Sequence, residues 1–316
     1  MSVSVLFFEM GFRVMKKLLY IYNPNAGRQQ SRAVLAEVLE VLAGEGYQLT
    51  VFPTAKAGDA TRAAFELAPQ HDRLVCCGGD GTLNEVVSGL LRLPEDARPV
   101  LGYIPMGSAN DFARNLNLPK TVAEQAKLAA TGEGKYVDIG DSSGRAFTYV
   151  SAFGLFTEVS YSTPQNMKNM LGHFAYLLEG AGQLMNVPSY HMTVHCEGRE
   201  PVEGDFIYGM VGNTVSLGGV VSLPKALVKR DDGEFEVLLI RKPHTLKDWQ
   251  DILTAAADLH IPCSGAVEGF SAKEVTFCCE HSVAWTVDGE FGGNREETVV
   301  KVLPRAIRVA AGNHAV

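Results

Sequence analysis

Apolar residues in the first part of the chain alternate between the spacing of strands and the spacing of helices. Four short apolar runs predict strands, at 18–22, 47–52, 74–77 and 100–104. Between these runs, apolar residues recur at helical spacing, at 34–42, 63–67 and 83–90. Ser31 and Asp59 are expected to cap the first two helices. This alternation predicts a parallel sheet with helices on both faces.

Strand signals dominate after residue 131. Runs typical of strands are separated by glycine and Asp-Gly turns, and they lie at 136–139, 146–151, 190–196, 205–212, 234–241, 274–278, 282–287 and 298–303. Helical spacing returns only at 166–184 and 245–258. The fold class expected is therefore α/β followed by β: an N-terminal parallel α/β domain over 15–130, and a mostly antiparallel β-sandwich or barrel over 131–316. Residues 1–14 are expected to be an N-terminal extension.

Composition narrows the function without identifying it. The chain has 316 residues, of which 46% are hydrophobic and 20% charged, which is typical of a folded protein of about two domains. The net charge of −8 argues against a nucleic-acid-binding protein. The six cysteines have no C-x-x-C spacing, which argues against zinc and favours a reducing compartment. No stretch predicts a transmembrane helix or a signal peptide, so we expect a cytoplasmic location.

The string Gly78-Gly-Asp-Gly-Thr-Leu-Asn84 follows a predicted strand and opens a predicted helix. Glycines there allow a phosphate to approach backbone amides at a helix N-terminus. Asp80 can hold a metal-bound water, and the Thr82 hydroxyl can donate a hydrogen bond to a phosphate oxygen. The alternative is a tight turn in which Asp80 or Thr82 only caps the helix. The string lacks the Gly-Lys-Ser/Thr of a Walker A loop.

Two further polar turns follow predicted strands, Asn23-Pro-Asn-Ala-Gly27 and Gly107-Ser-Ala-Asn-Asp-Phe-Ala-Arg114. Alone, the first is typical of an Asn-Pro turn and the second of a helix start capped by Ser108 or Asp111. All three turns lie where parallel strands end, however, and ligands bind at that edge of such sheets. Together they predict one cleft.

Two Asp-Gly pairs in the second part carry carboxylates. Val287-Asp288-Gly-Glu290 places a candidate base beside a second carboxylate, and Asp231-Asp232-Gly233 offers oxygen ligands to a cation such as Mg²⁺. For each, the alternative is a simple hairpin turn.

The ordered set NPNAG, GGDGTLN, GSANDFAR and VDGE resembles the diacylglycerol kinase catalytic-domain superfamily. More narrowly, it is similar to the bacterial soluble diacylglycerol and lipid kinases, which are related to sphingosine and ceramide kinases. The resemblance covers about residues 16–310. It implies an N-terminal nucleotide-binding α/β domain and a C-terminal β-sandwich, with ATP in the cleft between them. The positions implied for ATP contact are Asn23, Pro24, Asn25, Ala26, Gly27, Thr54, Gly78, Gly79, Asp80, Gly81, Thr82, Leu83, Asn84 and Ser108.

The resemblance also implies roles for the acidic residues. Asp288 would be the catalytic base, and Glu290 beside it would raise the pKa of Asp288 by like-charge repulsion. Asp80 and Asp111 would organise Mg²⁺ near the phosphates. A structural Mg²⁺ site would fall on Asp232, with Lys229 and Glu234 contributing backbone oxygens.

The function expected from the resemblance is transfer of the ATP γ-phosphoryl group to a lipid hydroxyl, with diacylglycerol as the first acceptor to test. Such an enzyme binds its lipid at a membrane surface. The sequence is compatible with a homodimer but does not determine the oligomeric state. A basic patch for the anionic surface is expected at Arg145, Lys168, Lys225, Lys229 and Arg230. The alternatives are an enzyme like NAD kinase, which shares a GGDGT loop, or a regulator that binds nucleotide or lipid without turnover.

Overall fold

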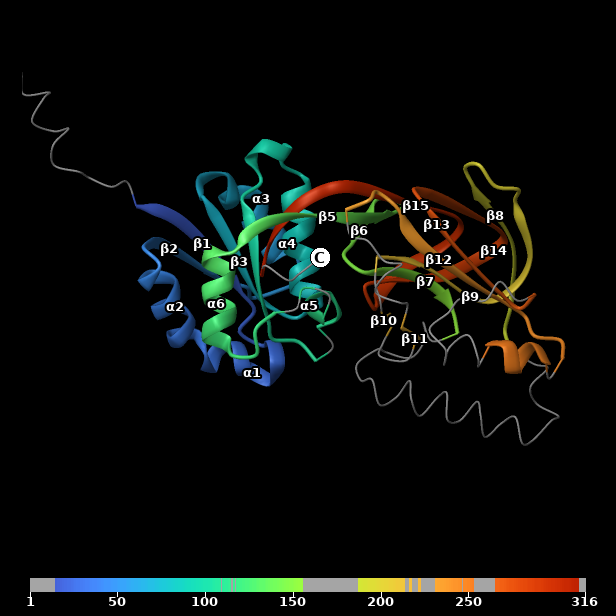
Figure 1. Ribbon diagram of the computed structural model, residues 1–316, viewed down its shortest axis with the longest axis horizontal. Helices are drawn as coiled ribbons and strands as arrows, with labels where there is room; N and C mark the ends of the chain where they lie inside the picture. Colours follow the sequence, from blue (N-terminus) through green and yellow to red (C-terminus); the bar gives the residue numbers. More distant parts are fainter. Residues whose placement is uncertain are drawn as a thin grey trace, which may run out of the picture.

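The computed structural model describes residues 15–108, 110–114, 116, 118–155, 187–213, 216–217, 221–222, 231–245, 247–252 and 265–312. An α/β part and a strand-rich part lie side by side in it (Figure 1). The helix expected at 166–184 lies outside the described residues. Of the one expected at 245–258, residues 247–252 are described and are helical. In the described part of the chain, no helix is long and apolar enough to cross a membrane.

The first part alternates strands and helices as the apolar pattern predicts. Its elements are β1 (Lys16–Tyr22), α1 (Ala26–Ala33), α2 (Leu35–Gly44), β2 (Tyr47–Pro53), α3 (Asp59–Leu67), η1 (Ala68–Gln70), β3 (Arg73–Gly78), α4 (Asp80–Leu91), η2 (Glu95–Ala97), β4 (Val100–Pro105), α5 (Asp111–Arg114) and α6 (Val122–Thr131). The strands pair in parallel in the order β2-β1-β3-β4. Their carboxyl ends therefore lie at one edge.

Both faces of this sheet are buried, because side chains along β1 alternate between two cores. Leu19 and Ile21 pack with apolar residues of α3 and α4, whereas Leu18 and Tyr20 pack with those of α2 and α6. All four side chains are fully buried. The three layers hold the strand ends, and the loops that follow them, on a rigid base.

Neither expected helix cap is correct. The first helix begins at Ala26, before Ser31, and the buried Ser31 hydroxyl donates to the Asn23 and Ala26 carbonyls. Gly58 is the N-cap of α3, and Asp59 Oδ2 accepts the amides of Ala55 and Lys56. The two side chains stabilise the turns that precede these helices.

The second part is built from antiparallel strands. They are β5 (Glu133–Ser142), β6 (Arg145–Phe147), β7 (Val150–Gly154), β8 (Tyr190–Cys196), β9 (Val202–Gly212), β12 (Phe235–Arg241), β13 (Val267–Ala272), β14 (Glu274–Val287) and β15 (Glu290–Ala311), with a small pair, β10 (Ser216–Leu217) and β11 (Val221–Ser222). The runs expected at 274–278 and 282–287 form one strand, β14, whose register with β15 shifts between Cys278 and Val283. Phe147, Phe153 and Trp285 fill its core.

The two parts share one hydrogen-bonded sheet, which the sequence did not predict. β15 runs from the second part into the first, where Val309 pairs in parallel with Leu101 of β4 (Figure 1). β5 pairs with β15 along this path, and the register shifts between Leu303 and Ile307. The fully buried Asp138 lies opposite the shift and accepts the Arg305 amide at 2.6 Å and the Gly233 amide at 2.8 Å. The crossing is therefore fixed by side-chain bonds as well as by the strands.

Candidate functional site

Three glycine-containing loops meet at the carboxyl ends of β1, β3 and β4. A Cβ added to Gly107 would lie 2.7 Å from the Gly79 Cα, and one added to Gly27 would lie 2.4 Å from the Met106 carbonyl oxygen. Only glycine allows such close packing of backbones. Asn23 Nδ2 also donates to Thr82 Oγ1 at 3.3 Å, which joins the first loop to the second. The convergence expected from the three motifs is present.

A cavity of about 340 Å³ opens beside these loops. Six of its lining residues were predicted from sequence: Asn23, Asn25, Thr54, Gly81, Thr82 and Glu290. Four were missed: Ala55, Lys56, Ala57 and Glu85. The signals for two of these were available, since Lys56 follows Thr54 past a strand end and Glu85 lies one helical turn beyond Thr82.

The glycine loop leads directly into α4. Gly79 is the extended N-cap and Asp80 is the first helical residue, so free amides and the positive end of the helix dipole lie at this point. Leu83 is one of nine predicted ATP contacts that do not line the cavity; the others are Pro24, Ala26, Gly27, Gly78, Gly79, Asp80, Asn84 and Ser108. The Leu83 side chain is fully buried in the core and its amide donates to the Gly79 carbonyl at 3.0 Å. Pro24 is likewise buried, whereas Ser108 is exposed beside the close-packed Gly107.

Asp80 and Asp111 influence each other, although neither lines the cavity. Burial raises the pKa of Asp80, and the negative charge of Asp111 raises it further. The Phe112 amide donates to Asp80 Oδ1 at 3.4 Å, which holds α5 against the glycine loop. Two acidic side chains in repulsion, with only oxygen ligands to offer, suit a divalent cation. No group of three or more Asp, Glu, His or Cys side chains within the described ranges is placed to hold a metal ion.

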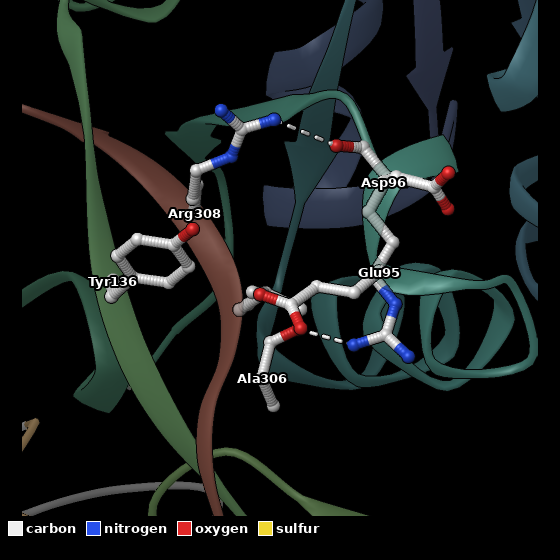
Figure 2. Close-up of a pocket in the computed structure, with 7 residues that line it drawn as sticks. Glu95, Asp96, Tyr136, Ala306 and Arg308 are labelled. Carbon is white, nitrogen blue, oxygen red and sulfur yellow. Dashed lines mark hydrogen bonds between the residues drawn. The ribbon is translucent and has the colours of Figure 1, made fainter.

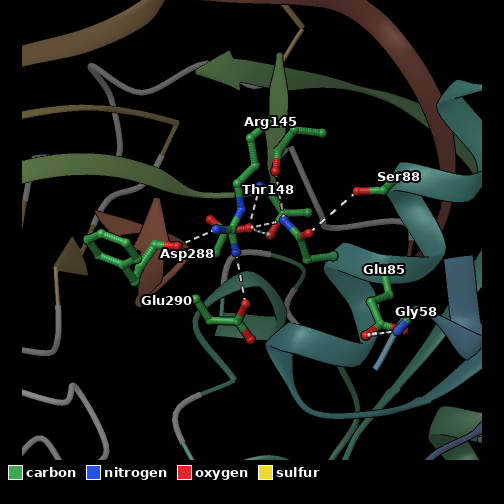
Figure 3. Close-up of polar contacts among 10 residues, drawn as sticks. Gly58, Glu85, Ser88, Arg145, Thr148, Asp288 and Glu290 are labelled. Carbon is green, nitrogen blue, oxygen red and sulfur yellow. Dashed lines mark hydrogen bonds and ion pairs between the residues drawn. The ribbon is translucent and has the colours of Figure 1, made fainter. Parts of the chain in front are cut away.

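Asp288 lies in the hairpin between β14 and β15, where its φ is +50°, and its side chain is buried. Its Oδ2 accepts three bonds, from Asn84 Nδ2 at 2.8 Å, the Thr148 amide at 2.7 Å and the Thr148 hydroxyl at 2.9 Å. Its Oδ1 accepts the Tyr149 amide at 3.0 Å and the Val150 amide at 3.2 Å. Asn84 lies in α4, the helix that follows the glycine loop, so the carboxylate joins the two parts of the molecule (Figure 3).

Burial raises the pKa of Asp288, and the bonds from Thr148, Asn84, Tyr149 and Val150 oppose that rise. The expected cause, repulsion by Glu290, is wrong. Glu290 has a side chain that is 64% exposed, and its Oε2 lies 2.9 Å from Arg145 Nη2 in an ion pair. The two carboxylates of the VDGE string therefore have opposite environments, because the sharp turn at Asp288 and Gly289 directs one inward and the other to the cavity.

The expected metal turn is partly described. Asp232 Oδ1 accepts the Glu234 amide at 3.1 Å, as in an ordinary Asx turn, and Asp232 is exposed. Lys229 lies outside the described residues, as do Lys168, Lys225 and Arg230 of the expected basic patch. Arg145, the described member of that patch, is engaged with Glu290 instead.

A second cavity, of about 440 Å³, lies where β15 crosses into the first part and contains none of the predicted site residues (Figure 2). Its lining residues are Glu95, Asp96, Arg98, Tyr136, Ala306, Ile307 and Arg308. Arg98 donates to the carbonyls of Leu91, Leu93 and Ala306, and Arg308 donates to the Arg98 carbonyl. Both arginines of this cavity thus donate hydrogen bonds to main-chain carbonyls where the two parts join.

The chain is similar to proteins named diacylglycerol kinase. The family model "Diacylglycerol kinase catalytic domain" matches residues 17–142, and "YegS C-terminal NAD kinase beta sandwich-like domain" matches residues 152–311. A diacylglycerol kinase of Staphylococcus saprophyticus is 35% identical over 280 residues, which is 88% of this chain and 90% of that protein. One of Staphylococcus aureus is 34% identical over 303 residues, covering 95% of this chain and 94% of that protein.

Solved structures agree. A crystal structure of a diacylglycerol kinase from Bacillus anthracis superposes with a TM-score of 0.74 at 25% identity, covering 96% of this chain and 99% of that one. A second crystal structure from that organism has a TM-score of 0.79 at 26% identity, covering 96% and 99%. With curated relatives over most of its length, this chain belongs to the diacylglycerol kinase family and is a lipid kinase.

Proposed function

We propose that this lipid kinase transfers the γ-phosphoryl group of ATP to the hydroxyl of diacylglycerol, giving phosphatidic acid. The observation that supports it best is the shared cavity, which is lined by the glycine loop of the first part and by Glu290 of the second. Phosphoryl transfer needs an acceptor and a donor held in line, with the charge of the phosphates neutralised. A cleft with one wall from each part can hold two substrates in this way.

The first wall fits a nucleotide. Asn23, Thr54 and Thr82 present side-chain oxygens or nitrogens to the cavity, and the close-packed glycines allow phosphates to reach main-chain amides. Ser108, exposed beside Gly107, would donate its hydroxyl to a phosphate oxygen. Asp80 and Asp111 would organise Mg²⁺ and its bound water near the phosphates through their carboxylate oxygens. When bound, that ion would neutralise charge on the phosphates.

Asp288 would accept the proton of the lipid hydroxyl. A carboxylate has about four acceptor positions, and Asp288 already accepts five bonds, so the hydroxyl must replace one donor. The same five bonds favour a second role, in which Asp288 positions the hairpin and joins it to Asn84. The pH dependence of turnover and of ATP affinity, measured together, separates the two roles. If Asp288 is a base, kcat should rise as it loses its proton while ATP affinity stays unchanged, whereas a carboxylate that only positions the hairpin should change both.

Three parts of the proposal rest on sequence resemblance rather than on described contacts. They are a structural Mg²⁺ at Asp232 and Glu234, association with a membrane surface from the cytoplasm, and a homodimer. Each has a direct test: Asp232→Ala with Mg²⁺ titrated against thermal stability, flotation with anionic vesicles, and sedimentation equilibrium. A Tm that rises equally with Mg²⁺ in both proteins contradicts the structural site.

The deciding experiment is a radiolabelled ATP assay with a panel of acceptors. Diacylglycerol, ceramide, sphingosine and monoacylglycerol are presented in detergent micelles, with NAD as a further acceptor. Label in phosphatidic acid, dependent on diacylglycerol, supports the proposal. Label only in another lipid changes the substrate, and no transfer to any lipid contradicts the proposed reaction.

A further inference from the structure

Arg145 of β6 makes two contacts with the hairpin that carries Glu290, and Glu290 lines the cavity. One terminal nitrogen, Nη2, lies 2.9 Å from Glu290 Oε2, and Nη1 donates to the Phe291 carbonyl (Figure 3). The Arg145 side chain is 35% exposed, so its guanidinium group borders solvent as well as the hairpin. The ion pair is thus accessible from the cleft and is not sealed in the core.

Glu290 brings this ion pair over the phosphate loop. Its Oε1 lies 3.1 Å from the position that a Cβ would take on Gly81, and Glu290 lines the cavity together with Lys56 and Thr82. Only one side chain therefore separates the Arg145 guanidinium from the glycine loop.

The charges around the cavity leave a problem for an anionic ligand. Glu85 also lines the cavity, but its carboxylate accepts the amides of Gly58 at 2.8 Å and Ala60 at 3.1 Å. Among the described residues, no main-chain amide donates to the Glu290 carboxylate, and its charge is balanced by Arg145. A triphosphate in the cavity meets Glu290 as a like charge. Besides Lys56, which lines the cavity, the Arg145 guanidinium beside Glu290 is a cation that can offset this repulsion.

We propose that Arg145 binds the terminal phosphate of ATP, exchanging its bond to Glu290 Oε2 for a bond to a phosphate oxygen. This inference rests on the proposed function. The planar guanidinium fork matches phosphate as well as carboxylate geometry, so the same N–H groups serve both partners. The exchange frees Glu290 and places a fixed positive charge where charge develops on the transferred group. Only ATP, and not ADP, carries the phosphate that Arg145 would contact.

The test compares ATP with ADP in the full chain without lipid. Binding of each nucleotide with Mg²⁺ is measured by calorimetry for the wild type and for Arg145→Gln. We expect the variant to lose about tenfold or more in ATP affinity, as for a charge-assisted bond, and little in ADP affinity. Arg199→Gln is the matched control, since Arg199 stacks on Phe270 at 4.3 Å in the second part, and both affinities should stay unchanged.

An equal loss for both nucleotides, or no loss for either, overturns the inference. An equal loss of affinity for ATP and ADP, together with a lowered Tm, is expected if Arg145 only stabilises the hairpin. If Arg145→Gln does not fold, Arg145→Lys decides, because a lysine keeps the charge but not the fork and should lower the ATP-to-ADP affinity ratio by about threefold. An unchanged ratio in that variant contradicts the proposal. Failure of the proposed function gives a different result in the acceptor assay: the wild type binds ATP but phosphorylates no lipid.

Discussion

The two parts of the molecule contribute different kinds of chemical group to the two walls of the cleft. The wall from the first part rests on close-packed glycine backbones and a helix start, with polar side chains such as Asn23 and Thr82 between them. The wall from the second part is the side chain of Glu290, which pairs with Arg145 and shares its hairpin with Asp288. A backbone wall depends on shape and a side-chain wall on charge. The two should therefore fail in different ways when substituted.

The largest effect is expected at the side-chain wall, for Asp288→Asn. Loss of a positioned base lowers kcat by about 10²–10⁴-fold. Stability should fall as well, because all but one of the five donors are N–H groups and either orientation of the new amide sets N–H against N–H. Turnover with diacylglycerol, ATP affinity and Tm are measured together.

Asp141→Asn is the control for this substitution, since Asp141 accepts the Gly144 amide in the exposed turn after β5. It should change neither turnover nor Tm appreciably. Near-native turnover of Asp288→Asn would contradict the role of Asp288 as a base and would mean that its five hydrogen bonds are purely structural.

At the backbone wall, Ser108→Val tests a hydroxyl in an exposed loop. Loss of a bond to a charged phosphate should cost about 1.5–3 kcal/mol, seen as a higher KM for ATP with an unchanged Tm. Thr131→Val removes a hydroxyl at the end of α6, where it bonds the Lys127 carbonyl, and should leave KM unchanged. Equal kinetics in the two variants would exclude Ser108 from phosphate binding.

Gly107→Ala tests shape alone. The added Cβ would lie 2.7 Å from the Gly79 Cα, so one loop must move, at a cost of about 1–3 kcal/mol. We expect weaker ATP binding and a lower Tm. Gly44→Ala, where a Cβ meets nothing within 4 Å, should be neutral or slightly stabilising. Unchanged ATP affinity in Gly107→Ala would mean that the close packing does not shape the nucleotide site.

The smallest effect concerns Glu236 of β12, outside both walls. Burial raises its pKa from 4.5 to about 7. Between these values the folded protein keeps a proton that the unfolded chain has lost, so this group makes stability fall as pH rises from about 4.5 to about 7. Glu236→Gln should remove that part of the slope in denaturant titrations. A slope identical to that of the wild type would show that Glu236 is ionised in the folded protein.

The sequence by itself determined the first wall and the identity of the charged residues. The continuous apolar run along β1 requires a sheet buried on both faces, and parallel strands must end at one edge, so three polar turns had to converge there. The VDGE string likewise showed that two carboxylates lie next to each other in the chain. Local sequence patterns suffice to predict strands, turns and neighbouring charges, because each of these features depends on residues that are close together in the chain.

Only the tertiary structure decided what those charges contact. Sequence placed Glu290 beside Asp288, but the left-handed turn at Asp288 separates them, so that one is saturated by amides and the other pairs with Arg145. Arg145 and Glu290 are far apart in the chain, as are Asn84 and Asp288, and no periodicity links them. Arg145 meets Glu290 because β6 pairs with β5, and β5 pairs with β15. Asn84 meets Asp288 because β15 continues from the second part into the sheet of the first. Both contacts depend on long-range strand pairing, which is set by the packing of the whole molecule.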